Sequence, residues 1–225
     1  MACAHNAGFV LLTVTMTTAP CLRIRALASL LAAAGMATVA HAEPFIDPAP
    51  TPAELQPFVL KGTRMAEWKA ADLDGDGRSD YVFVLQKLPP AQAKPDEGDE
   101  GKRVLKMAVR SADGKLNVVK TNDAVVYCEQ CGGANGDPFM SLDAGPRKFS
   151  VTHAGGGGPL SWSNTVTFNY SRIDSSWQLV RVETTTSDNF ERTKAKVRTY
   201  KPPRDFGKID IADFNPQKYL GVGPK

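Results

Sequence analysis

The residues best suited to chemistry lie in one short acidic stretch. Four carboxylates occupy nine positions there, at Asp72, Asp74, Asp76 and Asp80, with glycines between them. Like charges so close together repel one another unless a cation lies among them. Asp at the first, third and fifth places, glycine at the sixth and Asp at the ninth is the spacing of a calcium loop. The stretch therefore predicts a Ca²⁺ site made by these four carboxylates and the backbone carbonyl of Arg78.

The residues around the acidic stretch indicate which structure would hold it. An EF-hand needs a glutamate at the twelfth place and a following helix, but the twelfth residue is Phe83 and residues 81–86 read Tyr-Val-Phe-Val-Leu-Gln. Such a run favours a β-strand. We therefore expect a loop between strands at 64–70 and 81–87. The alternative is a solvated Asp/Gly turn that holds no ion.

The segment from Trp68 to Val82 resembles the calcium segment of the FG-GAP/VCBS-type repeat, which has an aromatic residue, then A-D-L-D-G-D-G, two residues, D and an apolar strand. The resemblance covers residues 68–87 and implies a calcium loop between two antiparallel strands, with Asp72, Asp74, Asp76, Arg78 and Asp80 around the ion. One copy is present, whereas a propeller needs about four blades. The resemblance thus implies the ion site and not a propeller. The rest of the chain is similar to small exported bacterial proteins with a single such loop.

Residues 1–42 have the features of a secretory signal peptide. They contain two basic residues, Arg23 and Arg25, no acidic residue, and an apolar stretch of small residues at 26–40. Ala40-His41-Ala42 fits a cleavage site, so Glu43 would begin the mature protein, and translation would then start at Met1 or Met16. The alternative is a membrane anchor, but the apolar stretch is shorter than the ~20 residues that span a bilayer. We expect export to the periplasm or the medium and no transmembrane anchor in the mature chain.

Composition limits the class of protein. Without Arg23 and Arg25, 25 basic residues remain against 24 acidic ones. This near-neutral balance gives no reason to expect nucleic-acid binding. The 183 residues that would follow cleavage suffice for one domain with a sizeable core, which we place at 58–225.

The remaining pattern predicts an antiparallel all-β domain of about nine or ten short strands, a meander or sandwich with no long helix. A proline-rich arm spans 43–57, with a helical turn at 52–56 that Pro57 should limit, and a flexible polar connection spans 88–103. Beyond the two strands around the acidic stretch, we expect strands at 104–110, 115–120, 124–128, 140–143, 148–153, 164–172, 177–185 and 194–200, and a tail at 208–214 along a sheet edge.

Cys128 and Cys131 are the cysteines of the predicted mature chain, and in an oxidising compartment they should be bonded to each other. A thiol–disulfide oxidoreductase would need this C-x-x-C at the start of a helix, whereas Gly132 and Gly133 follow it and suggest a turn. A metal site would need further ligands, for which the mature chain offers one imidazole, His153. The favoured interpretation is a structural disulfide.

Three weaker features remain. His153 is expected to be a surface or hydrogen-bonded residue rather than part of a catalytic triad. The run Gly155–Gly158 lacks the ending of a P-loop and predicts a flexible hairpin loop. The aromatic side chains of Trp162, Phe168, Tyr170 and Trp177 alternate along strands, as core residues do, although such residues can also form a carbohydrate platform.

Together these features predict an exported calcium-binding β-domain in which the ion is structural, and they favour a non-enzymatic role. Two alternatives stay open. One is a module that binds a glycan or another cell-envelope partner, and the other is a redox protein that uses Cys128 and Cys131.

Overall fold

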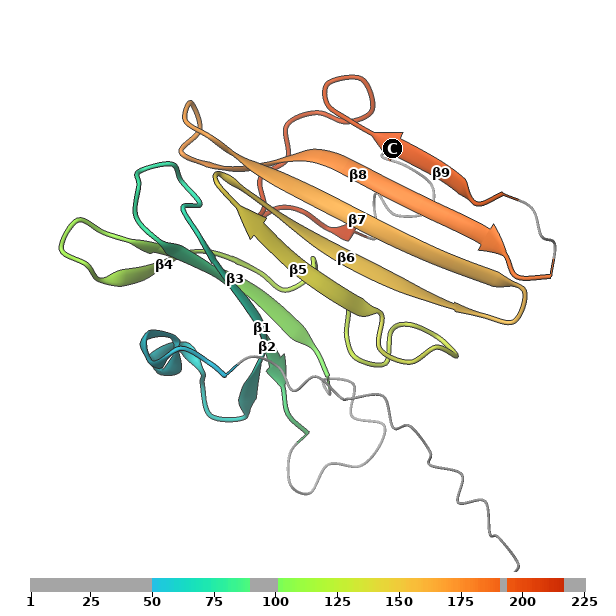
Figure 1. Ribbon diagram of the computed structural model, residues 1–225, viewed down its shortest axis with the longest axis horizontal. Helices are drawn as coiled ribbons and strands as arrows, with labels where there is room; N and C mark the ends of the chain where they lie inside the picture. The colour runs from blue at the N-terminus through green and yellow to red at the C-terminus, as the bar shows by residue number, and fades with distance from the viewer. Residues whose placement is uncertain (1–49, 90–100, 191–193, 217–225) are drawn as a thin grey trace, which may run out of the picture. The chain divides into compact units, whose positions relative to one another are not determined.

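Nine antiparallel strands in two sheets account for nearly all regular structure in the computed structural model (Figure 1). The structure describes residues 50–89, 101–190 and 194–216, and all of these belong to one compact unit, Ile46–Lys225. Neither sheet closes into a barrel, and the described strands form no propeller. The all-β antiparallel fold predicted from the alternation of apolar and polar residues is confirmed.

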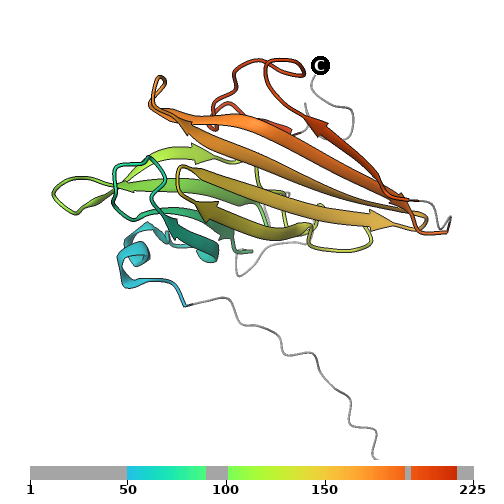
Figure 2. The same ribbon diagram turned by 45° about the horizontal axis from the view of Figure 1, so that its top comes forward.

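The first sheet is a meander with the order β1-β2-β3-β4. Its central strand β2 is buried from Asp80 to Gln86, because both of its faces are covered. Val82 and Val84 pack into the core between the sheets, whereas Phe83 and Leu85 pack toward a short 3-10 helix, η1 (Ala53–Phe58). Figure 2 shows η1 beside this sheet. The strand bounds are β1 Thr63–Ala71, β2 Asp80–Lys87, β3 Arg103–Arg110 and β4 Leu116–Asn122.

The second sheet is also a meander, with the order β5-β6-β7-β8-β9. Its long hairpin of β7 and β8 pairs from Leu160 with Asp188 down to Ser171 with Ser176. Burial alternates along β6 and β7, as expected for strands with one face on a core and one toward water. The bounds are β5 Phe139–Gly145, β6 Lys148–Gly157, β7 Leu160–Ser171, β8 Ser176–Asp188 and β9 Lys196–Tyr200.

One continuous apolar core joins the two sheets. Side chains of β2 and β3 from the first sheet and of β5 to β8 from the second belong to the same buried cluster. Phe149 and Phe168 stack at 5.1 Å between ring centroids, and Phe214 meets Phe168 edge-on at 5.4 Å. Phe214 comes from the tail, which lies along β8 through backbone bonds from Leu179 to Ile209 and from Ile211 to Trp177. The predicted course of residues 208–214 along a sheet edge is therefore confirmed.

Three local predictions were wrong. Residues 124–128 form no strand, with bends at 124–126 and no regular structure at 127–128, because the side-chain oxygen of Asn122 accepts hydrogen bonds from the backbone N–H groups of Ala124 and Val125 and turns the chain. The 3-10 helix η1 continues through Pro57 to Phe58. Of the predicted hairpin loop Gly155–Gly158, Gly155–Gly157 instead belong to strand β6 and pair with β7, and Gly158 alone lies in the turn between the two strands.

The predicted signal segment at 1–42 and residues 90–100 of the predicted polar connection lie outside the described residues. Within the described part of the chain, no helix has the length and apolar character needed to cross a bilayer.

Candidate functional site

The acidic stretch forms the connection between β1 and β2, as predicted. Ala71 at the end of β1 pairs with Asp80 at the start of β2, so residues 72–79 form a loop closed at its base by a strand pair. Asp72, Asp74 and Asp80 each direct one carboxylate oxygen into a common space, and these three atoms lie within 4.8 Å of one another. The structure therefore brings together three of the four carboxylates that the spacing selected.

Asp80 is the most constrained member of this cluster, with 0 % of its surface exposed. Its Oδ2 accepts a hydrogen bond from the backbone N–H of Leu73 at 2.9 Å, and its Oδ1 accepts one from the backbone N–H of Arg110 at 2.9 Å. One carboxylate thus links the loop to the end of β3. Burial raises the pKa of Asp80 despite these two bonds, and the neighbouring Asp76 and Asp72 charges raise it further.

The side chain of Asp72 stabilises the tight turn of the loop. Its two carboxylate oxygens accept backbone hydrogen bonds from Gly75, Asp76 and Gly77, at 2.8, 3.1 and 3.0 Å. Gly75 and Gly77 have φ values of +83° and +90°, which glycine adopts without steric cost. The alternation of acid and glycine in the sequence is what permits this compact turn.

Asp74 and Asp76 lie differently. Asp74 is part of the converging set, and its pKa is raised by burial and by the charge of Asp80. The carboxylate of Asp76 instead forms an ion pair with the guanidinium of Arg78 and accepts a hydrogen bond from the Arg78 backbone N–H at 2.8 Å. Arg78 also binds the carbonyl of Arg110 through Nε at 2.7 Å. The structure therefore places Asp76 beside Arg78 and outside the cluster of three.

Residues of the second sheet also bind the acidic loop through hydrogen bonds. The side chain of Leu73 is fully buried in the core between the sheets. Its carbonyl accepts a hydrogen bond from the indole Nε1 of Trp177 at 2.9 Å, and the carbonyl of Asp72 accepts one from the backbone N–H of Arg147 at 2.8 Å. Trp177, Arg147 and Arg110 are the residues that sequence reasoning did not connect with the loop. Their separation from it along the chain leaves no local signal.

The cysteine pair is bonded, with Sγ of Cys128 and Cys131 2.04 Å apart, as predicted. Residues 127–138 form turns and an isolated bridge, and no helix begins at the pair. Glu129, between the two cysteines, accepts a hydrogen bond from the side chain of Gln86 at 2.6 Å. The disulfide therefore belongs to a segment that is attached to the first sheet.

A buried polar network lies beneath that segment. Arg103, 3 % exposed, donates to the carbonyl of Tyr127 at 2.9 Å, to Asp137 Oδ1 at 2.7 Å and to Gln86 Oε1 at 3.1 Å. Burial raises the pKa of Asp137, but the hydrogen bonds from the Arg103 guanidinium and the Phe139 backbone N–H, together with the positive charge of Arg103, outweigh burial and hold the pKa below its usual value. The Arg103 charge is thereby compensated inside the protein.

His153 lies next to this network and is 1 % exposed. Its Nε2 accepts a hydrogen bond from the backbone N–H of Tyr127 at 3.2 Å, so it is a hydrogen-bonded residue, one of the two predicted possibilities. Burial and the nearby charge of Arg103 lower the pKa of His153 to about 4, although Asp137 opposes this shift. The imidazole is neutral at physiological pH.

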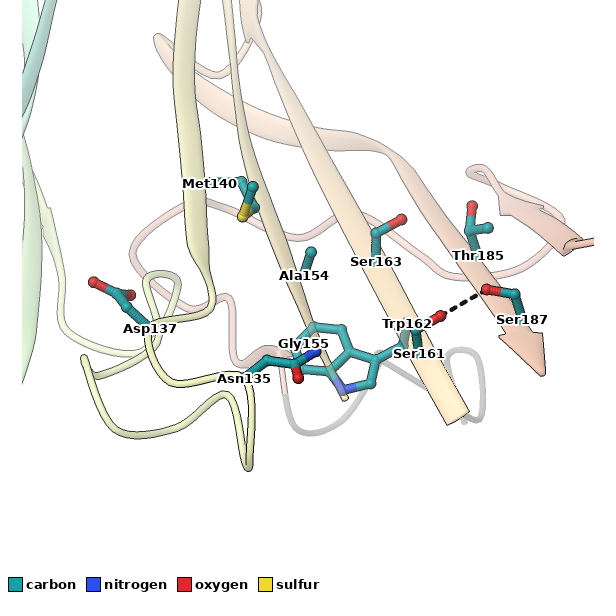
Figure 3. Close-up of a pocket in the computed structure, with 10 residues that line it drawn as sticks. All are labelled: Asn135, Asp137, Met140, Ala154, Gly155, Ser161, Trp162, Ser163, Thr185 and Ser187. Atoms are coloured by element: carbon teal, nitrogen blue, oxygen red, sulfur yellow. Dashed lines mark hydrogen bonds between the residues drawn. The ribbon is translucent and has the colours of Figure 1, made fainter. Parts of the chain in front are cut away.

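A pocket with a volume of about 360 Å³ lies at the end of the second sheet where β6 turns into β7. Figure 3 shows the residues that line it. Of the four aromatic residues on alternating positions, Phe168 and Trp177 are buried in the core, and Tyr170 is partly buried against the core. Trp162 is the one that contributes to the lining of this pocket. The full lining set is Asn135, Asp137, Met140, Ala154, Gly155, Ser161, Trp162, Ser163, Thr185 and Ser187.

Comparison of the chain with protein-family models, with curated proteins and with solved structures found no match. The comparison with family models therefore does not support the resemblance of residues 68–87 to the FG-GAP/VCBS-type repeat.

Proposed function

We propose that this protein is an exported, non-enzymatic β-domain that binds one structural Ca²⁺ in the loop 72–80. The observation that carries the proposal is the convergence of Asp72, Asp74 and Asp80 within 4.8 Å around a fully buried Asp80. Among the described residues, no lysine or arginine forms an ion pair with any of these three carboxylates. A divalent cation would convert their mutual repulsion into attraction.

The donor set favours calcium among the common divalent ions. Carboxylate oxygens are hard ligands, and calcium accepts six to eight of them in flexible geometry, whereas magnesium demands a near-ideal octahedron and dehydrates reluctantly. In a loop built from two positive-φ glycines and tied by backbone hydrogen bonds, we expect the oxygen ligands to lie at irregular angles, which calcium tolerates better than magnesium does. The proposal also includes Asp76 and the backbone carbonyl of Arg78, which the loop spacing assigns to the ion.

The structural role follows from the contacts of the loop. Asp80 connects it to β3 of the first sheet, and Leu73 and Asp72 connect it to Trp177 and Arg147 of the second sheet. An ion held by Asp72, Asp74 and Asp80 would stabilise a segment that contacts both sheets. Carboxylates that are committed to an ion are poor general acids, so the proposal assigns them no catalytic role.

The test is the thermal stability of the purified mature chain with calcium and with EDTA. For a site with a Kd of about 10⁻⁴ M, as in extracellular modules, calcium at about 100 times that value should add about 2.7 kcal/mol to the free energy of unfolding. In a chain of this size the melting temperature should rise by roughly 5–10 °C. The Asp74→Ala variant should lose this response.

The matched control is Asp143→Ala, which removes an exposed carboxylate on β5 outside the loop and should keep the full calcium response. Magnesium at the same concentration should give a smaller rise. Equal melting temperatures of the wild-type chain in calcium and EDTA would reject the structural-ion proposal.

Export is a separate part of the proposal. It predicts that the protein recovered from the periplasm or the medium begins at Glu43. Intact-mass measurement of the secreted chain checks this, and a product that retains residues 1–42 would contradict cleavage.

A further inference from the structure

Another pocket, with a volume of about 440 Å³, lies beside the end of the second sheet where β7 turns into β8. Asn169 of β7 and Gln178 of β8 both line it, and they lie directly opposite each other in the two strands. The neighbouring pair, Phe168 and Leu179, is buried in the core. Because successive side chains of a strand point to opposite faces, the two carboxamides lie together on the outer face of the sheet.

The apolar part of this pocket comes from the same side of the sheet and from the segment that follows β9. Pro202 and Pro203 line the pocket from that segment, and Val180 lines it from the bulge in β8. Tyr170 and Leu179 also border the pocket, but they pack toward the core. The volume lies within the range of small-molecule sites, which combine apolar surface with a few placed polar groups.

A buried acceptor in the pocket lining indicates what a ligand must supply. Oε1 of Gln178 is buried and accepts no hydrogen bond from any described residue. The nitrogen of the same carboxamide donates to Asp210 Oδ2 at 3.4 Å. Since an ionised carboxylate only accepts, the oxygen and nitrogen of Gln178 cannot exchange places. Buried polar atoms are nearly always paired, and a ligand N–H in this pocket would provide the partner of Oε1.

The charged side chains of the pocket cancel each other. They are Asp174 and Lys208, which form an ion pair, and Asp174 also accepts a hydrogen bond from Ser171 Oγ at 2.7 Å. A charged ligand would therefore find no unpaired counter-charge among the lining residues. The pocket favours a neutral ligand.

A peptide strand cannot extend the sheet at this place. The backbone N–H of Leu179 donates to the carbonyl of Ile209 at 2.8 Å, and the carbonyl of Trp177 accepts from the N–H of Ile211 at 2.9 Å. The other edge of β8 is paired with β7. The strand edges beside the pocket are thus occupied, and a ligand must be recognised by side chains.

We propose that this pocket binds the acetamido group of an N-acetylated sugar in a glycan. The acetamido N–H donates to Oε1 of Gln178, and the acetamido carbonyl accepts from Nδ2 of Asn169, which is exposed. The methyl group packs against Pro202, Pro203 and Val180. One acceptor, one donor and a small apolar surface are the features that the lining supplies, and the acetamido group carries the complement of all three.

This site is separate from the acidic loop. The loop contacts Trp177 through its indole, on the core face of β8, whereas Gln178 lies on the outer face of the same strand. The glycan is titrated in the presence of calcium, and the calcium response is measured without glycan. Either proposal can therefore fail while the other stands.

The experiment is a calorimetric titration of the mature chain with triacetylchitotriose and with cellotriose, which has a hydroxyl in place of each acetamido group. Triacetylchitotriose should bind at least about tenfold more tightly than cellotriose. Gln178→Leu removes the buried acceptor at nearly constant volume and should lower the affinity for triacetylchitotriose about tenfold. Asn169→Ala changes an exposed side chain, so the fold is kept, and the affinity should fall about fivefold.

The matched control is Gln56→Leu, the same change at an exposed glutamine in η1, which should bind as the wild type does. Acetyl-lysine amide carries the acetamido group without a sugar ring and should bind more weakly than triacetylchitotriose. Four results would each overturn the proposal. They are no binding of triacetylchitotriose, equal binding of cellotriose, tighter binding of acetyl-lysine amide, and wild-type affinity in both Gln178→Leu and Asn169→Ala.

Discussion

The indole Nε1 of Trp177 donates a hydrogen bond to the backbone carbonyl of Leu73 across 2.9 Å. Trp177 lies in β8 of the second sheet, and Leu73 lies inside the acidic loop of the first sheet. The bond is buried, and Leu73 stands between two of the converging carboxylates, Asp72 and Asp74. The position of the loop is therefore coupled to the packing of the two sheets against each other.

The first prediction concerns this bond. Trp177→Phe removes the donor and leaves the buried carbonyl of Leu73 without its partner, which should lower the free energy of unfolding by about 2–4 kcal/mol. Because the carbonyl adjoins the proposed ligands, calcium affinity should fall about tenfold. Calorimetric titration with calcium measures the second effect. Trp162→Phe makes the same chemical change away from the loop and should leave calcium affinity intact. An unaltered affinity in Trp177→Phe would show that the loop holds its shape without the second sheet.

The second prediction separates the two roles of the carboxylates. Asp80→Ala leaves the backbone N–H groups of Leu73 and Arg110 without an acceptor, at a cost of about 2–4 kcal/mol. This loss should be present even in EDTA. Asp74→Ala should cost little in EDTA and should lose the gain from calcium. Denaturant unfolding of both variants, with and without calcium, measures this. Equal behaviour of the two variants in EDTA would contradict the assigned role of Asp80.

The third prediction concerns pH. The pKa of His153 lies at about 4 in the folded protein, against an ordinary value of 6.5. Between these values the unfolded chain binds a proton at His153 that the folded chain does not, so the free energy of unfolding falls as the pH falls through this window. The full effect is about 3 kcal/mol. His153→Gln, whose side-chain oxygen can still accept from Tyr127, should show a shallower slope between pH 6.5 and 4. Parallel slopes for the two proteins would place the source of the acid sensitivity elsewhere.

The fourth prediction concerns the disulfide. Cys128 and Cys131 close a small ring on a turn, and no helix N-terminus is present there to stabilise a thiolate. We expect no insulin-reductase activity and no free thiol in the native mature chain. The double change Cys128→Ser/Cys131→Ser should cost about 2 kcal/mol, because a short loop restricts the unfolded chain only modestly. Measurable insulin reduction by the wild-type chain would instead support the redox alternative.

The strand pattern was readable in the sequence because side chains alternate with a period of two. The segment from Asn164 to Arg172 shows this alternation, and the structure places it in β7 as far as Ser171, with the expected face on the core. The apolar pattern led to a wrong strand prediction at 124–128, where a side chain hydrogen-bonds to the backbone. Val125 and Val126 are apolar and buried, but the backbone N–H groups of Ala124 and Val125 donate hydrogen bonds to the side-chain oxygen of Asn122, which turns the chain there and prevents a strand.

The glycine run at 155–157 led to the opposite error, because a loop was predicted where a strand forms. Gly155–Gly157 have no side-chain pattern, and glycine is depleted in strands. They form a strand because their backbone pairs with β7, and because the loop at Gly132 and Gly133 approaches Gly156 through a bridge and a backbone bond of 3.3 Å. Only the small size of glycine permits that approach, and the partner is distant in sequence.

The sequence alone determined the acidic loop, the strands on either side of it and the cysteine pair, because each depends on residues within a few positions of one another. The tertiary structure decided that Asp72, Asp74 and Asp80 converge, that Asp76 lies beside Arg78, and that Trp177 and Arg147 hold the loop from the second sheet. It also decided that Trp162 contributes to the lining of a pocket while Phe168 and Trp177 are buried. The physical reason is that burial and hydrogen-bond partners depend on which strands pack together, and that packing joins residues about a hundred positions apart.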